Sequence, residues 1–269
     1  MASPRKQNLT HKNPKSLEEK KPMAKAVILA ADPAEGLLES QKKYPKPLTP
    51  ILGIPLLERL LKTLQRAGIT QAIIVTGYLS HTIRKHLGDG SKLNIQIQYA
   101  YSRKYKQGNA ISLKAARKYL PETEPFLLST ADTLVNSKIV KKALSNINHM
   151  PLLCVDFKPR YSRQTKKATK VFVSKEGHIV DIGKDIHKRN GASAGILLLN
   201  NTIWNAIDRS EKNESPLTIA ECLRQLIAEG SPLWACDVSN HFWFHIDTLE
   251  DVKFVEQLLS GFPKSREIA

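Results

Sequence analysis

Cysteine and long apolar runs are scarce in this chain of 269 residues. Its three cysteines lie far apart and form no Cys-x-x-Cys or Cys/His cluster, so neither a disulfide framework nor a zinc site is expected. No run approaches the roughly 18 apolar residues of a membrane-spanning helix, and the basic N-terminus lacks the apolar segment of a signal peptide. The sequence therefore predicts a soluble cytoplasmic protein without a membrane span.

Acidic residues are also few, because 25 Asp and Glu stand against 41 Lys and Arg, which gives a formal net charge of +16. Such an excess indicates an anionic partner. Part of it lies in residues 1–24, which are predicted to be a disordered basic tail, and part in a run along residues 158–170 that contains no acid. Neither run carries the series of interleaved aromatic residues that stack on bases, so a nucleic acid is not the expected partner.

Short apolar runs alternate with helical patterns along the chain, as in a sheet covered by helices. This predicts an α/β fold with a Rossmann-like mixed, mostly parallel sheet flanked by helices. Residues 25–262 are predicted to form one domain and residues 263–269 a tail. Strands are expected at Ala26–Ala31, Ala72–Gly77, Ile95–Ala100, Phe126–Thr130, Leu152–Phe157, Ala168–Ser174, His178–Ile182 and Ala192–Leu199, with helices over the leucines of 56–64, over 110–120, at Leu217–Ala228 and at Leu249–Leu259.

The segment from Ala26 to Glu58 carries the most specific pattern. An apolar strand is followed by a polar loop, by Lys46-Pro47-Leu48 and by a Gly-x-Pro-Leu-Leu-Glu stretch. This order resembles the opening of the nucleotidyltransferase superfamily, in which a Gly-x-Gly-x-Arg loop wraps the triphosphate and a Lys-Pro follows. Lys46 falls on the family lysine, whereas Asp32 and Ala34 stand in the places of the two glycines and Gly36 in the place of the arginine.

The remainder of the chain is similar to one subgroup, the cytidylyltransferases that activate inositol 1-phosphate, phosphocholine-like alcohols and phosphonates. The similarity is carried by Gly108-Asn109-Ala110-Ile111-Ser112-Leu113, by the apolar strand that ends in Asp132, by Ala168-Thr169-Lys170-Val171 and by Asp247-Thr248-Leu249-Glu250-Asp251. It implies the nucleotide-diphospho-sugar transferase fold, with a nucleotide-binding half at 25–150 and an acceptor-binding half at 151–262.

The resemblance also implies roles for individual residues. Asp132 would hold Mg²⁺ at the α-phosphate, Lys46 would brace the triphosphate, and Lys184 would act with them on the acceptor phosphate. The implied nucleotide-binding residues are Ala30, Ala31, Asp32, Lys46, Gly108, Asn109 and Ser112, and the implied acceptor-binding residues are Lys170, Lys184 and Gly195.

Several positions depart from the subgroup pattern. His245 stands where the family usually has an aspartate that serves as a second metal ligand, and Asp247, two residues on, is a candidate substitute. The predicted metal ligands are therefore Asp132, Asp247 and His245, and strand alternation would place Asp247 on the same face as His245 at a shifted depth. Lys167 replaces an acidic residue, Ser193-Ala194-Gly195 replaces Asp-Thr-Gly, and Thr133 replaces a histidine.

The phosphate loop raises a charge problem. Asp32 and Glu35 would repel a triphosphate unless a metal ion or Lys42, Lys43 and Lys46 offset them. The first hypothesis is an Mg²⁺-dependent enzyme that joins a nucleoside monophosphate, with CTP the favoured donor, to a phosphorylated small molecule. The alternatives are a non-catalytic relative that binds a nucleotide or a protein partner, and a basic nucleic-acid-associated protein. A homodimer is a further expectation.

Overall fold

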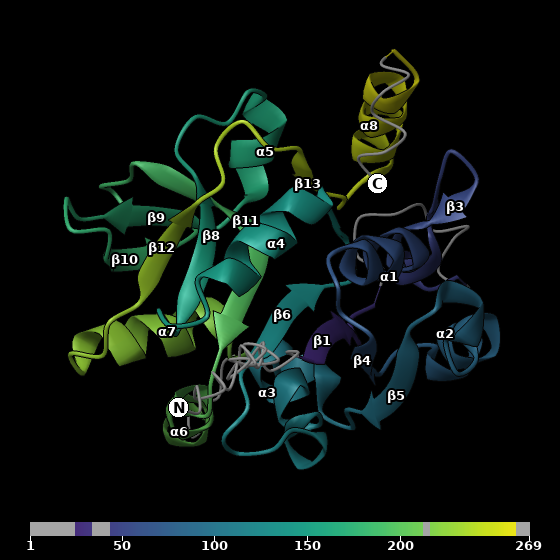
Figure 1. The fold of residues 1–269 in the computed structure, drawn as a ribbon, viewed down its shortest axis with the longest axis horizontal. Coiled ribbons are helices and arrows are strands. Elements are labelled where there is room, and N and C mark those ends of the chain that lie inside the picture. Colours follow the sequence, from purple (N-terminus) through teal and green to yellow (C-terminus); the bar gives the residue numbers. More distant parts are fainter. Residues whose placement is uncertain (1–24, 34–43, 212–215, 262–269) are drawn as a thin grey trace, which may run out of the picture.

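The computed structural model describes residues 25–33, 44–211 and 216–261. A nine-stranded sheet forms its centre, with the strand order β10-β9-β11-β6-β1-β4-β5 and with β8 and β12 attached beside β11 (Figure 1). The predicted mixed sheet flanked by helices is confirmed. The strands are β1 (Lys25–Ala30), β4 (Gln71–Thr76), β5 (Gln96–Tyr101), β6 (Phe126–Thr130), β8 (Leu152–Asp156), β9 (Lys170–Val173), β10 (Ile179–Gly183), β11 (Gly191–Leu199) and β12 (Trp234–Asp237).

The first half of the sheet is parallel. β1 lies at its middle, paired in parallel with β4 on one side and with β6 on the other, and β5 pairs in parallel with β4. Ala26, Val27 and Ile28 are completely buried because helices cover both faces of the strand, which explains why its sequence is a continuous apolar run instead of an alternating one.

Helices cover the two faces of the sheet in separate sets. Leu57, Leu60, Leu61 and Leu64 repeat at helical spacing and pack against the face of β1 that carries Ala26 and Ile28. The opposite face of β1, with Val27 and Leu29, packs against α3, α6 and α7. The first set comprises α1 (Leu56–Arg66), α2 (Ser80–Leu87) and α4 (Ser137–Ser145), and the second α3 (Asn109–Lys114), α6 (Thr202–Ser210) and α7 (Ile219–Ala228).

The second half of the sheet is largely antiparallel and continues the first without a break. β11 pairs antiparallel with β6, β8 and β9, while β12 pairs in parallel with β8. The sheet therefore brings residues of both halves to one edge. The division of the domain at residue 150 stays a prediction.

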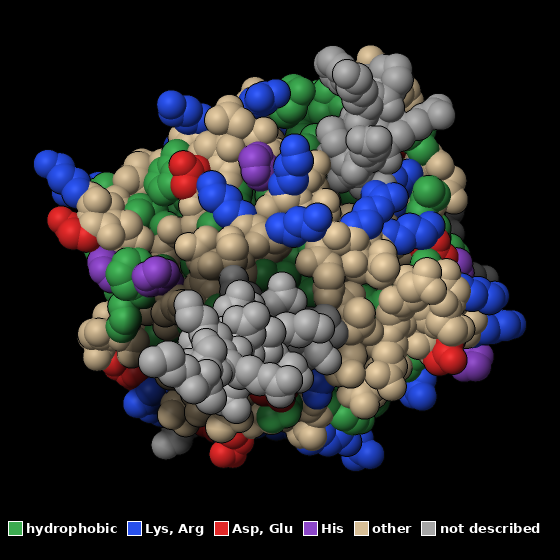
Figure 2. Space-filling model, viewed as in Figure 1, with side chains coloured by type: hydrophobic (Ala, Val, Ile, Leu, Met, Phe, Trp, Pro, Cys, Tyr) green, Lys and Arg blue, Asp and Glu red, His purple; other side chains and the backbone are tan. Residues whose placement is uncertain are grey.

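Smaller elements close this edge of the sheet. β7 (Thr133–Val135) pairs antiparallel with β13 (Trp243–His245), and α8 (Leu249–Gly261) packs beside them in a third apolar cluster. α5 (Ser162–Lys167) belongs to the predicted basic run, and Figure 2 shows Lys and Arg side chains crossing the upper part of the face from α5 towards α1. The remaining elements are β2 (Pro50–Ile51), β3 (Ile54–Pro55) and the 3-10 turns η2 (Lys46–Leu48), η3 (Ser91–Leu93), η4 (Tyr105–Gln107) and η5 (Arg117–Tyr119).

Glycines end the first two helices. Gly68 follows α1 with φ +98° and Gly88 caps α2 with φ +58°, a conformation that side chains with a Cβ rarely adopt. Within the described residues, none of the helices combines the length and the apolar character that crossing a lipid bilayer requires.

Candidate active site

A cavity of about 890 Å³ opens at the carboxyl ends of β1 and β6. The strand order changes direction there, because the chain places β4 and β5 on one side of β1 and then β6 on the other. In open α/β sheets this is the usual ligand position. Both halves of the chain line the cavity, with Asn109, Thr130 and Asp132 from the first half and Lys167, Lys184, Gly195, His245 and Asp247 from the second.

Lys46 joins two carboxylates from distant parts of the chain. Its Nζ lies 2.6 Å from Asp132 Oδ2 and 2.9 Å from Asp247 Oδ1. Burial alone would lower the pKa of Lys46, but the two carboxylates outweigh it and raise that pKa to about 12. Burial would likewise raise the pKa of Asp132, yet the charges of Lys46 and His245 and the hydrogen bonds from Lys46 and Thr130 hold it below its usual value. Lys46 and Asp132 therefore stay charged at neutral pH.

Local structure fixes each member of this ion triad. Lys46 is the first residue of η2, where Pro47 suits the first turn of a helix. Asp132 follows β6, and its carbonyl accepts from Ile246 N at 3.0 Å. β13 ends at His245, so Asp247 lies beyond the strand and strand alternation does not apply to it.

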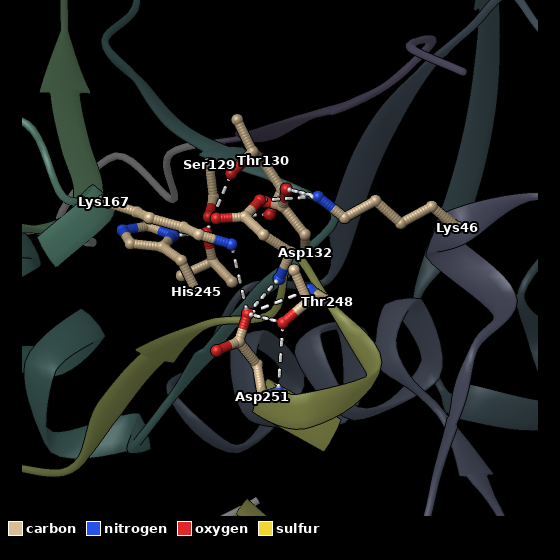
Figure 3. Close-up of polar contacts among 10 residues, drawn as sticks. Lys46, Ser129, Thr130, Asp132, Lys167, His245, Thr248 and Asp251 are labelled. Atoms are coloured by element: carbon tan, nitrogen blue, oxygen red, sulfur yellow. Dashed lines mark hydrogen bonds and ion pairs between the residues drawn. The ribbon is translucent and has the colours of Figure 1, made fainter. Parts of the chain in front are cut away.

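Asp251 holds the backbone on which Asp247 stands. Its Oδ2 accepts from Asp247 N at 3.1 Å and from Thr248 N at 2.9 Å, and Thr248 Oγ1 accepts in return from Asp251 N at 3.3 Å. This reciprocal pattern is a capping box at the start of α8. The same carboxylate lies 3.7 Å from Lys167 Nζ, so it also anchors a cation of the cavity wall (Figure 3). The Thr-x-x-Asp spacing in the sequence could have revealed this role.

A chain of polar side chains leads from Asp132 to His245. Thr130 Oγ1 and Thr133 Oγ1 are 2.9 Å apart, and Thr133 Oγ1 lies 3.2 Å from His245 Nδ1. Gly195 faces the imidazole, since a Cβ at position 195 would lie 2.5 Å from His245 Cε1. Figure 3 shows Lys46 reaching Asp132 from one side and His245 and Lys167 lying on the other.

Apart from Lys46, the predicted nucleotide-binding residues occupy two places. Ala30 and Ala31 are buried at the end of β1, and Asp32 is exposed just beyond them. Gly108 and Asn109 begin α3 and join it to α7, because Asn109 Oδ1 accepts from Ile219 N at 2.8 Å. A Cβ on Gly108 would lie 2.1 Å from the Leu217 carbonyl oxygen, and Ser112 is buried behind them. Asn109 also lines the cavity.

The predicted acceptor-binding residues are divided between two cavities. Lys184 and Gly195 line the main cavity. Lys170 instead lines a second pocket of about 480 Å³, with Lys166 and Arg189, and its Nζ donates to the Lys184 carbonyl. Its binding role stays a prediction.

Two of the predicted metal ligands meet at the same lysine, and the third contacts a different residue. Asp132 and Asp247 both reach Lys46 Nζ, whereas His245 Nδ1 contacts Thr133. The described part of the chain contains no cluster of three or more His, Cys, Asp or Glu side chains arranged as a metal site. Two carboxylates do suit Mg²⁺, which takes one or two of them and completes its shell with water and substrate phosphate oxygens. The loop residues Ala34, Glu35, Gly36, Lys42 and Lys43, and both predicted tails, lie outside the described residues.

Comparisons with known proteins agree with this architecture. The family model described as "Nucleotidyl transferase" matches residues 25–258. A bifunctional IPC transferase and DIPP synthase of Rubrobacter xylanophilus is 28% identical over 240 residues, which are 89% of this chain and 53% of that protein. Its counterpart in Aquifex aeolicus is 27% identical over 239 residues, 87% of this chain and 51% of that protein. The chain thus spans about half the length of these curated relatives.

A solved structure gives the same result for the fold. The inositol-1-phosphate CTP transferase from T. maritima superposes with a TM-score of 0.78 at 24% identity, covering 92% of this chain and 98% of that one. A UDP-glucose pyrophosphorylase in complex with UDP-glucose superposes with a TM-score of 0.74 at 16% identity, covering 89% of this chain and 99% of that one. At these identities the likeness concerns the fold.

Proposed function

This chain belongs to the nucleotidyl transferase family, and on that basis we propose that it transfers a nucleoside monophosphate to a phosphorylated alcohol such as inositol 1-phosphate, or to a phosphonate, and releases pyrophosphate. CTP is the favoured donor, because the similar T. maritima protein is described as an inositol-1-phosphate CTP transferase. The names of the two curated relatives, both IPC transferases, support the same acceptor class.

One observation carries the proposal: the ion triad of Lys46, Asp132 and Asp247 adjoins the cavity that Lys184 also lines. Residues from both halves of the sheet therefore surround one space. A donor and an acceptor can meet there, with the triad at the end of β6 and the lysine on the wall beyond β10.

The reaction needs charge stabilisation more than proton transfer. An oxygen of the acceptor phosphate attacks the α-phosphorus in line, the bond from that phosphorus to the bridging oxygen of the β-phosphate breaks, and pyrophosphate leaves with the electron pair. The attacking oxygen is already anionic, so no general base is required. Lys46 offsets negative charge at the triphosphate, and Lys184 orients the acceptor phosphate.

Mg²⁺ fits the carboxylates of Asp132 and Asp247, which would hold it; when bound, it supplies positive charge to the phosphate oxygens. Asp32 adds negative charge to the phosphate loop and would repel the triphosphate, so the positive charge of the metal ion matters more here. We also propose that the protein is cytoplasmic; Cys154 on β8 and Cys236 on β12 are register partners and free thiols, which is compatible with a reducing compartment.

The alternative is a non-catalytic relative that binds a nucleotide. In its favour, Lys46 pairs with both of the carboxylates that would otherwise be available to a metal ion. Thermal unfolding shows whether a nucleotide binds, since a bound ligand raises the free energy of unfolding by RT ln(1 + [L]/Kd). Stabilisation by CTP with Mg²⁺ is expected under both hypotheses.

Pyrophosphate release decides between them. Wild-type protein supplied with CTP, Mg²⁺ and inositol 1-phosphate should release pyrophosphate, and Asp132→Asn should reduce turnover on the order of a thousandfold. Asp185→Asn is the matched control, because Asp185 lines the same cavity but makes no ion pair with Lys46. Stabilisation by CTP without pyrophosphate release across a panel of phosphorylated alcohols and phosphonates would reject the enzyme and retain the binder.

A further inference from the structure

The second pocket, of about 480 Å³, has no part in the transfer reaction proposed above. Residues of α5, β9 and β11 and of the loops beside them line it. Its charged lining residues are Lys166, Lys170 and Arg189, and none of the described residues that line it is acidic. A cleft lined by charges of one sign attracts ions of the opposite sign. Because its volume lies in the range of about 300–1,000 Å³ that is usual for small organic ligands, the pocket suits a small anionic molecule.

One segment of the chain separates this pocket from the main cavity. Lys166 and Lys170 line the second pocket, whereas residues 167–169 between them line the main cavity. Lys170 Nζ donates to the Lys184 carbonyl, and Lys184 itself belongs to the main cavity. Among the described residues, the two linings have no member in common. A molecule in the second pocket therefore occupies a different space from the nucleotide and the acceptor.

The cations of the second pocket are not neutralised by neighbouring acids. In the described part of the chain, Lys166, Lys170 and Arg189 form no ion pair. Lys167 in the main cavity differs, because its Nζ lies 3.7 Å from Asp251 Oδ2. Like charges around one pocket repel one another, so an anion bound among them would relieve that repulsion.

Asn190 holds the backbone next to Arg189 in place. Its Oδ1 accepts from Val173 N at 2.8 Å, and its Nδ2 donates to the Val173 carbonyl at 2.8 Å. Its backbone N also donates to the Val171 carbonyl at 3.0 Å. Arg189 is exposed and follows from a loop that is bonded to β9. Its guanidinium can bind a phosphate group through two parallel hydrogen bonds.

Phe157 and Pro159 give the pocket an apolar side. Both line it and both are half-buried. Phe157 is fixed through its backbone N, which donates to Ser239 Oγ at 2.9 Å. An inorganic anion would leave this apolar surface in water, whereas an organic phosphate with an apolar group would cover it.

We propose that the second pocket is a binding site for phosphate monoesters that carry an aromatic or other apolar group, and that it is separate from the site of nucleotidyl transfer. Arg189, Lys166 and Lys170 bind the phosphate, and Phe157 and Pro159 contact the apolar group. The inference goes beyond the proposed function, because it needs neither turnover nor the ion triad.

Calorimetric titration of the full chain with phenyl phosphate at low salt tests the site. Arg189→Gln should weaken binding about tenfold, and Lys166→Gln about threefold, because a lysine supplies a single point charge. Lys188→Gln is the matched control, since Lys188 is an exposed cation of the same loop that lines neither pocket. Its affinity should stay within about twofold of wild type. Absence of binding to wild type, or an equal loss in Arg189→Gln and Lys188→Gln, would overturn the inference.

Lys184→Gln shows which pocket holds the phosphate. Binding of phenyl phosphate should survive in Lys184→Gln, because the Lys184 side chain is not part of the second pocket. Loss in Lys184→Gln together with full affinity in Arg189→Gln would place the phosphate in the main cavity and reject the inference.

Inorganic phosphate tests the apolar side of the pocket. It should bind about tenfold more weakly than phenyl phosphate, because it leaves Phe157 and Pro159 uncovered. Equal affinities would contradict the preference for an apolar group. If wild type releases no pyrophosphate from CTP and inositol 1-phosphate, the proposed function fails, but these titrations still decide the role of the second pocket.

Discussion

The floor and the wall of the cavity are built differently. We call the ion triad beside the cavity its floor; the side chains of Lys46, Asp132 and Asp247 are 14%, 24% and 34% exposed, and Lys46 pairs with both aspartates. The wall carries Lys167 and Lys184, which are exposed. Paired, half-buried charges cannot be replaced singly without leaving a partner uncompensated, whereas exposed charges can. We therefore propose that the floor carries the transfer chemistry and that the wall sets the choice of acceptor.

The largest expected contrast comes from matched lysine substitutions in the two regions. Lys46→Met leaves two carboxylates side by side and should lower the free energy of unfolding by about 2 kcal/mol. Lys184→Met should change it by less than about 0.5 kcal/mol. Urea denaturation measures both. Equal losses in the two variants would remove the distinction between floor and wall.

The pH dependence of the same variants sharpens this test. Because the folded protein lowers the pKa of Asp132, the stability from its pairing with Lys46 is present above the unfolded pKa and is lost as the pH falls through the lowered value. The advantage of wild type over Lys46→Met should therefore shrink towards acid. Added Mg²⁺ should stabilise Lys46→Met more than wild type, since the carboxylates are then free.

An intermediate effect is expected at the junction of floor and wall. Asp251→Asn keeps one acceptor oxygen but loses the charge that attracts Lys167, and it weakens the capping box that supports Asp247. We expect a loss of about 1 kcal/mol in thermal unfolding and about a tenfold fall in turnover. Asp185→Asn is the control at an exposed carboxylate of the cavity. Unchanged turnover in Asp251→Asn would show that the position of Asp247 does not depend on the capping box.

The smallest effect is expected within the wall itself. Lys184→Ala should raise the KM for the acceptor about tenfold, because Lys184 lines the main cavity. Lys170→Ala should raise it by less than about threefold, because Lys170 lines the second pocket and its Nζ donates to the Lys184 carbonyl. Steady-state kinetics with varied acceptor measures both. A larger rise in KM for Lys170→Ala than for Lys184→Ala would indicate that the acceptor phosphate binds in the second pocket instead.

Much of the fold could be predicted from local patterns. Phe126–Thr130 matches β6 residue for residue, and the leucines of 56–64 match α1, because a central parallel strand and an amphipathic helix each have a clear apolar period. β12 and α4 were not predicted. β12 is only four residues long and partly exposed, so its sequence shows little apolar pattern.

The site was harder to predict, because its contacts join residues far apart in sequence. The resemblance named Lys46, Asp132 and Asp247, yet their convergence on one ammonium depends on pairs 86 and 201 residues apart. Strand alternation predicted Asp247 on the same strand face as His245, at a shifted depth, but β13 ends before Asp247. The dependence of His245 on Gly195 follows from the packing of β13 against β11, which no local pattern contains.

A crystal structure with a non-hydrolysable CTP analogue and Mg²⁺ would show whether the ion triad holds the nucleotide. We expect the triphosphate at the carboxyl ends of β1 and β6, within contact of Lys46, with the metal ion on Asp132 and Asp247 and with Lys184 facing the acceptor space. A nucleotide bound anywhere else, or phosphates held without Lys46 and Asp132, would contradict it.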